Sequence, residues 1–260
     1  MASQGRKNED EMVFFLNNRK ISELSNNLKE LIGEIYGVVD PSVVLKCTLA
    51  EDYIKPDILI DYNGIIKAVS LKCINGSIVH QERIDTFLNF LRGLGISDET
   101  IETLLLHQYG DGTTDGSGGK RMQFGELIVW LDERIKKANA ELNQKEFLIP
   151  VMERALFQGV RSDAKRADAI YVGNYEKGIC VIRKQFHKYF ERKEFNFMKT
   201  LHIGPFMIRP HARYIDTEIV NEESRHRIDF LWYKMVADME YINKKYDSYM
   251  PVRYRKEDND

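Results

Sequence analysis

One short stretch, KPDILIDYNGIIKAVSLK at positions 55–72, constrains the fold of this chain more than any other. Asn63 and Gly64 stand between two apolar runs. This dipeptide favours a two-residue type I′ turn, because both central residues of that turn need a positive φ angle. The stretch therefore predicts a β-hairpin in a fixed register, with Tyr62 opposite Ile65.

The register gathers three polar side chains at the open end of the hairpin. Asp57 is expected opposite Ser70, and Lys72 shares the face of Ser70, because side chains alternate between the faces of a strand. The opposite face is nearly all apolar and must pack against other elements; its members are Ile58, Ile60, Tyr62, Ile65, Val69 and Leu71. An exposed Asp57–Lys72 ion pair contributes only about 0–1 kcal/mol. The three residues are therefore either a cap on the strand ends or part of a functional site.

The composition is that of a folded protein of the cytoplasm. Hydrophobic residues make up 43% and charged residues 30% of the 260 positions. No apolar run approaches the roughly 18 residues that a membrane helix needs, and the first twelve residues have no apolar core of a signal peptide. The three cysteines lie far apart without a CxxC pair, which argues against disulfides and a zinc site. We expect a cytoplasmic protein without a membrane partner.

The charge is unevenly distributed along the chain, although the net charge is only −2. Residues 161–213 hold 12 Lys and Arg against 5 Asp and Glu, and the flanking segments are acidic. A basic segment of this kind indicates either a surface that faces a polyanion or an ordinary solvated face.

Periodicity and turn signals predict a mixed α/β or α+β fold with a central mixed β-sheet flanked by helices. The expected order begins with a helix over 9–36, a strand over 42–49 and the hairpin. A strand or loop then leads into a helix that ends at Gly93 or Gly95, and a further helix is capped by Ser97. A glycine-rich loop at 110–120, helices over 122–142 and 145–157, and mostly strands from Ala167 complete the chain. We expect a single domain over 1–260, with a hairpin core at 37–95, a helical part at 96–160 and a basic, strand-rich part at 161–240.

The hairpin motif resembles the PD-(D/E)XK nuclease superfamily. Pro56-Asp57 is followed after twelve residues by Ser70-x-Lys72, and the family presents its catalytic Asp and Lys on such a hairpin. The stretches at 76–105 and 120–138 resemble small type II restriction endonucleases that cut four-base-pair sites. The chain departs from the common pattern at Ser70, where most members carry Asp or Glu.

The resemblance implies a restriction-endonuclease-like core with a Mg²⁺ site. Asp57 and the backbone carbonyl of Leu71 would bind the metal, Ser70 would complete the motif, and Lys72 would act on the water or the phosphate. Because Ser70 is not acidic, a further carboxylate must come from elsewhere. The candidates are Glu34 or Glu30 before the first strand, and Glu82 after Lys72.

Two groups of residues are candidates for contact with DNA. Ser77, His80 and Gln81 follow the hairpin, where they could meet the DNA backbone. The segment IGPFMIRPHARYI alternates so that Arg209, His211 and Arg213 share one face, and arginine reads guanine through two hydrogen bonds. Arg183, Lys184 and Lys188 are expected to contact phosphates. The alternative for the late segment is an edge strand whose charges prevent aggregation.

These patterns favour a Mg²⁺-dependent type II restriction endonuclease that cleaves double-stranded DNA as a monomer or homodimer. One alternative is a structure-specific repair or recombination nuclease. Another is a catalytically inert nucleic-acid-binding protein with a nuclease-like fold, which the serine at position 70 keeps open. The chain has no GxxxxGK[ST] phosphate loop and no GxSxG nucleophile motif.

Overall fold

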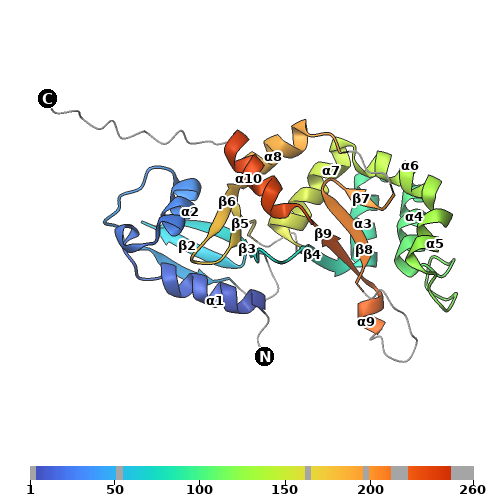
Figure 1. Ribbon diagram of the computed structural model, residues 1–260, viewed down its shortest axis with the longest axis horizontal. Coiled ribbons are helices and arrows are strands. Elements are labelled where there is room, and N and C mark those ends of the chain that lie inside the picture. The colour runs from blue at the N-terminus through green and yellow to red at the C-terminus, as the bar shows by residue number, and fades with distance from the viewer. Residues whose placement is uncertain (1–3, 51–54, 162–164, 196–198, 212–221, 247–260) are drawn as a thin grey trace.

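Two β-sheets, each accompanied by helices, form the framework of the protein in this computed structural model (Figure 1). The structure describes residues 4–50, 55–161, 165–195, 199–211 and 222–246. The fold is mixed α/β, as the sequence predicts. The predicted mixed sheet is present, but it does not hold all the strands, since those after the hairpin divide between it and a second, antiparallel sheet.

The first sheet is mixed and contains the predicted hairpin. Its order is β1-β2-β3-β5-β6, and all neighbours are antiparallel except the parallel pair β3 and β5. Its strands are β1 Lys46–Leu49, β2 Ile58–Tyr62, β3 Ile65–Lys72, β5 Ala169–Gly173 and β6 Gly178–Ile182. Asn63 and Gly64 have φ angles of 52° and 84°, and Ile58 pairs with Val69. The predicted type I′ turn and register are therefore confirmed.

The second sheet is antiparallel, with the order β4-β9-β8-β7. Its strands are β4 Ile78–Arg83, β7 His202–Ile203, β8 Phe206–Pro210 and β9 Arg227–Leu231. Only five residues separate Lys72 from the start of β4, so the end of the hairpin leads directly into this second sheet. The short connection places the two sheets side by side (Figure 1).

Helices account for most of the remaining described residues. They are α1 Gln4–Leu16, η1 Ile21–Glu23, α2 Asn26–Tyr36, α3 Ile84–Leu94, α4 Asp98–Tyr109, α5 Phe124–Trp130, α6 Asp132–Leu142, α7 Lys145–Met152, the π-helical turn η2 Glu153–Gln158, α8 Arg183–Arg192, α9 Glu222–Arg225 and α10 Met235–Tyr246. Ser97 caps α4, Gly95 ends α3 in the left-handed region, and a loop over 110–120 separates α4 from α5, as predicted. No helix of the described residues is long and apolar enough to cross a membrane.

Two apolar clusters hold these layers together. The apolar face of the hairpin packs against α1 and α2, and its Ile58, Ile60 and Val69 are fully buried there. The opposite face of the first sheet, the second sheet and the helices from α3 onward share a larger cluster that contains Phe186, Phe230 and Trp232 among others. The hairpin therefore lies between the two clusters, with its Asp57 and Ser70 face turned away from α1 and α2.

The single helix expected over 9–36 is two helices. Asn18 has a φ angle of 56°, its N–H donates to the carbonyl of Leu45, and Lys20 forms an isolated bridge with Val44. The chain thus leaves the helix to pair with the segment before β1, and Ser25 then caps α2 through the N–H of Leu28. Tertiary pairing overrides the helical periodicity here.

The region after Ala167 contains more helix than the sequence predicts. Helices α8 and α10 lie between and after the late strands, and α9 precedes β9. Phe186, Tyr189 and Phe190 of α8 recur at helical spacing and are all buried. Arg183, which was expected on a strand, begins this helix.

Candidate active site and nucleic-acid interface

Asp57 stands immediately before β2 and is held by donors from β3. Its Oδ2 accepts hydrogen bonds from the hydroxyl of Ser70 at 3.0 Å and from the backbone N–H of Leu71 at 2.5 Å. The side chain is 19% exposed. Among the described residues Oδ1 has no hydrogen-bond partner, so one oxygen fixes the carboxylate and the other is available to a ligand.

Lys72 completes the cluster at the end of β3. Its Nζ lies 3.0 Å from Ser70 Oγ, 3.0 Å from the carbonyl oxygen of Leu71 and 3.8 Å from Asp57 Oδ2. The ammonium is thus surrounded by a carboxylate, a hydroxyl and a carbonyl. These oxygens belong to the residues that the sequence predicts around a metal ion, which indicates a site that favours a cation.

Glu9 of α1 is a carboxylate that the sequence reasoning did not single out, and its pKa is affected by the charges of Asp57 and Lys72. Asn8 donates to the carbonyl of Gly173 at the end of β5, and Met12 is fully buried under the first sheet, so this turn of α1 is fixed against the hairpin. Burial, and then the charge of Asp57, raise the pKa of Glu9, while Arg6 and Lys72 oppose that shift. No local pattern in the sequence indicates that the charges of Glu9 and Asp57 interact.

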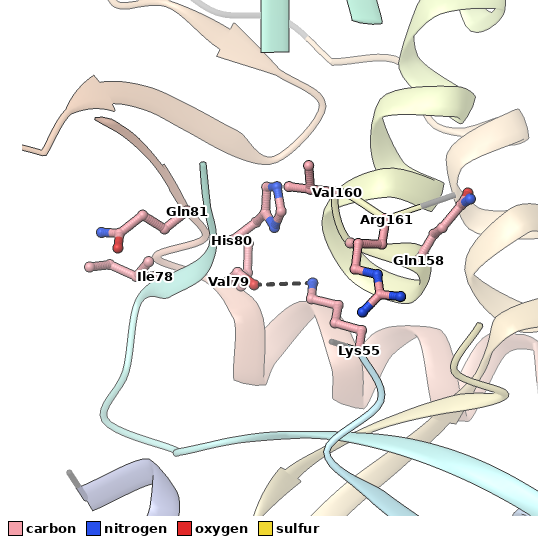
Figure 2. Close-up of a pocket in the computed structure, with 9 residues that line it drawn as sticks. Lys55, Ile78, Val79, His80, Gln81, Gln158, Val160 and Arg161 are labelled. Carbon is pink, nitrogen blue, oxygen red and sulfur yellow. Dashed lines mark hydrogen bonds between the residues drawn. The ribbon is translucent and has the colours of Figure 1, made fainter. Parts of the chain in front are cut away.

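Lys55 connects this site to the second sheet. Its Nζ donates to the carbonyl oxygen of Val79 in β4 at 3.5 Å (Figure 2). It also donates to the carbonyl oxygen of Ala155 in η2. Burial lowers the pKa of Lys55 well below its ordinary value, and the charge of Lys72 lowers it further. Because Asp57 follows two residues later, this double anchor fixes the start of the hairpin relative to both elements.

A pocket of about 320 Å³ lies beside Lys55, between β4 and the end of η2. In Figure 2 the side chain of Arg161 lies next to Lys55, and Gln81 projects from the opposite side of β4 from His80. The pocket is lined by Lys55, Ile78, Val79, His80, Gln81, Gln158, Gly159, Val160 and Arg161. Arg161 is the basic side chain of this pocket, because burial disfavours the charged form of Lys55 and the Lys55 Nζ already donates to two carbonyl oxygens.

The acidic residues suggested by the sequence lie elsewhere. Glu30 and Glu34 of α2 line a different pocket, beside Tyr171 and Cys180 of the first sheet. This places both carboxylates on the opposite face of the hairpin sheet from Asp57 and Ser70, because α2 covers the face that bears Ile58 and Ile60. Neither glutamate is brought to the Asp57 cluster.

Glu82 is fully engaged inside the protein. Its oxygens accept from Arg154, with a shortest contact of 2.6 Å, and from His80 Nε2 at 2.9 Å. Burial raises the pKa of Glu82, but the hydrogen bonds from His80 and Arg154 outweigh burial and lower it overall. Burial lowers the pKa of His80 to about 4, although Glu82 opposes this. Both side chains are nearly inaccessible to solvent, with exposures of 5% for His80 and 1% for Glu82, although His80 also lines the pocket beside Lys55.

The candidates for DNA contact divide into three sets. Gln81, Arg209 and His211 converge on Asp229 of β9, which the sequence reasoning did not single out. Ser77 lies just before β4, where its carbonyl accepts from the N–H of Trp232. Arg213 lies outside the described residues.

The basic residues expected to contact phosphates belong to α8. Arg183 Nε donates to Glu153 at 2.8 Å, and His187 contacts the same carboxylate. Arg183 and Lys184 line a pocket of about 430 Å³ together with Lys67 and Asp168. Lys188 lies on the same helix, one turn after Lys184. This places the basic residues beside the first sheet rather than beside β8.

The residues around Asp57 fit a Mg²⁺ ion. The described residues contain no group of three or more His, Cys, Asp or Glu side chains that could hold a metal. Mg²⁺ does not need one, because it keeps several water ligands and binds proteins through one or two carboxylates. Asp57 Oδ1 and the carbonyl of Leu71 supply oxygen atoms of the required type, and the ammonium of Lys72 lies 3.0 Å from that carbonyl oxygen and 3.8 Å from Asp57 Oδ2.

Comparison with known proteins adds no relative from which a role could be transferred. A scan against protein-family models gives no match, and a search of curated proteins gives none either. The function of this chain must therefore be inferred from the residues themselves, and the arrangement around Asp57 and Lys72 is the part that carries chemical information.

Proposed function

We propose that the protein is a Mg²⁺-dependent endonuclease that cleaves double-stranded DNA at a specific short site. One observation carries this proposal: the Lys72 ammonium lies among Asp57 Oδ2, Ser70 Oγ and the carbonyl of Leu71 at the end of a packed hairpin. A plain ion pair needs only the two charges. Here the site also contains a carboxylate oxygen, Asp57 Oδ1, that has no hydrogen-bond donor among the described residues.

Each residue has a role in this proposal. A bound Mg²⁺ would stabilise charge on the scissile phosphate and lower the pKa of the attacking water. Asp57 would hold it through Oδ1, which has no donor among the described residues, and the carbonyl of Leu71 would add a ligand. Glu9 would act as an outer carboxylate, through its charge. Ser70 orients Asp57 through its hydroxyl, and Lys72 would orient the water or neutralise charge on the phosphate.

The rest of the molecule offers surfaces to a long polyanion. The pocket between β4 and the end of η2 is lined by Arg161, and α8 adds further basic residues beside the first sheet. Phosphates would be positioned by such cations, while sequence would be read by side chains that reach base edges. A DNA duplex that spans both sheets satisfies both needs.

A catalytically inert DNA-binding protein is the second candidate, and a specific observation favours it. Ser70 is neutral, and its hydroxyl donates a hydrogen bond to Asp57 at 3.0 Å. The hairpin therefore supplies one carboxylate, whereas most members of the superfamily that it resembles have two. Glu9 answers this objection only if it takes part in metal binding. The experiment below separates the two candidates.

The test is digestion of supercoiled plasmid DNA with Mg²⁺, with EDTA added to a parallel reaction. We expect discrete bands that disappear with EDTA and with Asp57→Asn, because an amide is a much poorer ligand for a hard dication. Asp132→Asn removes an exposed carboxylate on α6 and serves as the matched control that keeps cutting. A smear would identify a non-specific nuclease. Cleavage of a branched DNA substrate, with the plasmid left intact, would identify a structure-specific nuclease. Intact plasmid under all conditions would overturn the proposal.

A further inference from the structure

The second sheet has one apolar face and one polar face. His80, Glu82, Ile228, Phe230 and Ile208 alternate onto the core face and are buried. The alternate positions form the opposite face, which also holds Met207 and Leu231. We call its polar part the reading face; it comprises Gln81, Arg83, Arg209, Arg227 and Asp229, with His211 just after β8. Antiparallel sheets commonly have one apolar and one polar face. The polar face here carries arginine, glutamine and aspartate, which are residue types that can hydrogen-bond to the edges of bases.

Asp229 lies at the centre of the reading face and is completely buried by its neighbours. Its Oδ1 accepts from Gln81 Nε2 at 2.8 Å and faces His211 Nδ1 at 3.0 Å. Its Oδ2 accepts from Arg209 Nε at 3.3 Å and Nη2 at 3.2 Å. A buried carboxylate with polar neighbours on both oxygens fixes the side chains that surround it.

The sheet register arranges these residues in two rows. Gln81, Asp229 and Arg209 are direct cross-strand partners on β4, β9 and β8. Arg83 pairs with Arg227, and the N–H of His211 donates to the carbonyl of Arg227, which forms the neighbouring row. Rows two residues apart along a strand are separated by roughly 7 Å. Two base-pair steps along B-DNA span about the same distance.

The charges of the reading face are largely compensated. Arg83 bonds to Asp85 and Glu223, and Arg227 bonds to Glu223 at 3.2 Å and to Gln81 Oε1 at 3.3 Å. A surface that binds phosphates without reading sequence has uncompensated Lys and Arg. Here Arg83 and Arg227 are held by hydrogen bonds to neighbouring side chains. Their fixed geometry favours directional hydrogen bonds to bases over non-specific attraction to phosphates.

We propose that Asp229 is a positioning residue that presents Gln81, Arg209 and His211 as the base-reading set of this protein. The inference rests on the proposed function and goes beyond it by naming the surface that selects the DNA sequence. Arg209 directs Nε and Nη2 toward Asp229, which sets the plane of its guanidinium before DNA arrives. Gln81 is held in the same way, and glutamine reads adenine as arginine reads guanine, each with two hydrogen bonds. Side chains fixed in advance lose less entropy on binding.

The experiment measures discrimination between DNA sequences. The cut site is read from the ends of wild-type digestion products, and duplexes with that site and with single-base changes are titrated in Ca²⁺ at one salt concentration. We expect Asp229→Asn to lower the ratio of cognate to altered affinity roughly tenfold to a hundredfold. The cleavage rate on saturating cognate DNA should fall by less than that ratio. A merely structural role would weaken binding to all duplexes equally.

Surface variants keep the test valid if Asp229→Asn does not fold. Gln81→Ala and Arg209→Lys alter the reading face without removing a buried charge, and Arg209→Lys retains the charge while losing the planar fork. Both should reduce discrimination at one base pair each. Glu102→Gln is the matched control, because it breaks an exposed carboxylate–arginine pair with Arg134 on α4 and α6.

The outcomes separate the two proposals. A wild-type protein that cuts at a defined site, together with variants that discriminate as well as wild type, overturns the role of the reading face and leaves the proposed nuclease function intact. A wild-type protein that neither cuts nor binds DNA overturns both. Reduced discrimination in the Gln81 and Arg209 variants, with the Glu102 control unchanged, supports the inference.

Discussion

Asp57 and Asp229 are both aspartates held among donors on a sheet face, yet their oxygens are used differently. Asp57 is 19% exposed and receives its donors on Oδ2, so that Oδ1 has no protein donor among the described residues. Asp229 is 1% exposed, and polar side chains contact both of its oxygens. A carboxylate oxygen without a hydrogen-bond donor can bind a ligand. A carboxylate that has donors on both oxygens instead positions the side chains around it.

Glu82 extends the comparison to a third carboxylate. Like Asp229 it is 1% exposed and has cationic or polar partners on both oxygens, from Arg154 and His80. Unlike Asp229, it points into the core and not toward the exposed face. Proximity of an acidic residue to a motif in the sequence therefore says little about its role. The predictions below test whether exposure and free oxygens distinguish chemical from structural carboxylates.

Lys72→Ala should have the largest effect, because it removes the only cation held directly among the oxygens of the Asp57 cluster in the described structure. Cleavage should fall roughly a hundredfold to a thousandfold or more, while binding in Ca²⁺ to the cognate duplex survives. Lys67→Ala on the same strand removes a lysine paired with Asp168 at 3.2 Å and should leave cleavage intact. Equal loss of binding and cleavage in Lys72→Ala would mean that the charge only holds the hairpin together.

Glu82→Gln should destabilise the fold, because it leaves Arg154 without its charged partner at a site only 12% exposed. Breaking a buried ion pair costs about 3–5 kcal/mol. Asp57→Asn should lose much less stability but abolish cleavage. Urea denaturation of both variants gives the comparison. Similar losses of unfolding free energy in the two would contradict the distinction between these carboxylates.

Glu9→Gln should weaken metal binding without changing recognition of DNA. Loss of an outer carboxylate at a metal site costs roughly tenfold to a hundredfold in metal affinity. The Mg²⁺ concentration for half-maximal cleavage should rise by that factor. Glu11→Gln, an exposed change two residues along α1, is the control. An unchanged Mg²⁺ dependence in Glu9→Gln would remove α1 from the site.

The pH dependence of stability should report the buried His80. Its folded pKa of about 4 lies below the ordinary value of 6.5, so the unfolded chain binds the proton first. Stability is therefore retained above pH 6.5 and lost as pH falls toward 4, by about 1.4 kcal/mol per pH unit. The lowered pKa of Glu82 continues the loss below pH 4.5. His80→Gln should flatten the upper part of this profile in chemical denaturation; an unchanged slope would contradict the burial of a neutral histidine.

Local signals predicted the elements whose geometry depends on adjacent residues. The Asn63-Gly64 turn, the register that places Asp57 opposite Ser70, the Ser97 cap and the end of α3 at Gly95 all agree with the structure. Each depends on backbone conformation or capping within a few residues. The helix predicted over 9–36 failed for the opposite reason, because pairing of Lys20 with Val44 depends on a distant segment.

The sequence by itself determined the hairpin, its buried apolar face and the cluster of Asp57, Ser70 and Lys72, because the pleat and the turn type leave one register. Only the tertiary structure decided that Glu9 lies near this cluster, that Glu82 is enclosed by Arg154 and His80, and that Asp229 gathers Gln81 and Arg209. These residues are 48 to 148 positions from at least one of their neighbours in each group. Packing of helix on sheet and pairing of strands across such separations depend on the burial of the whole apolar surface, which no local pattern records.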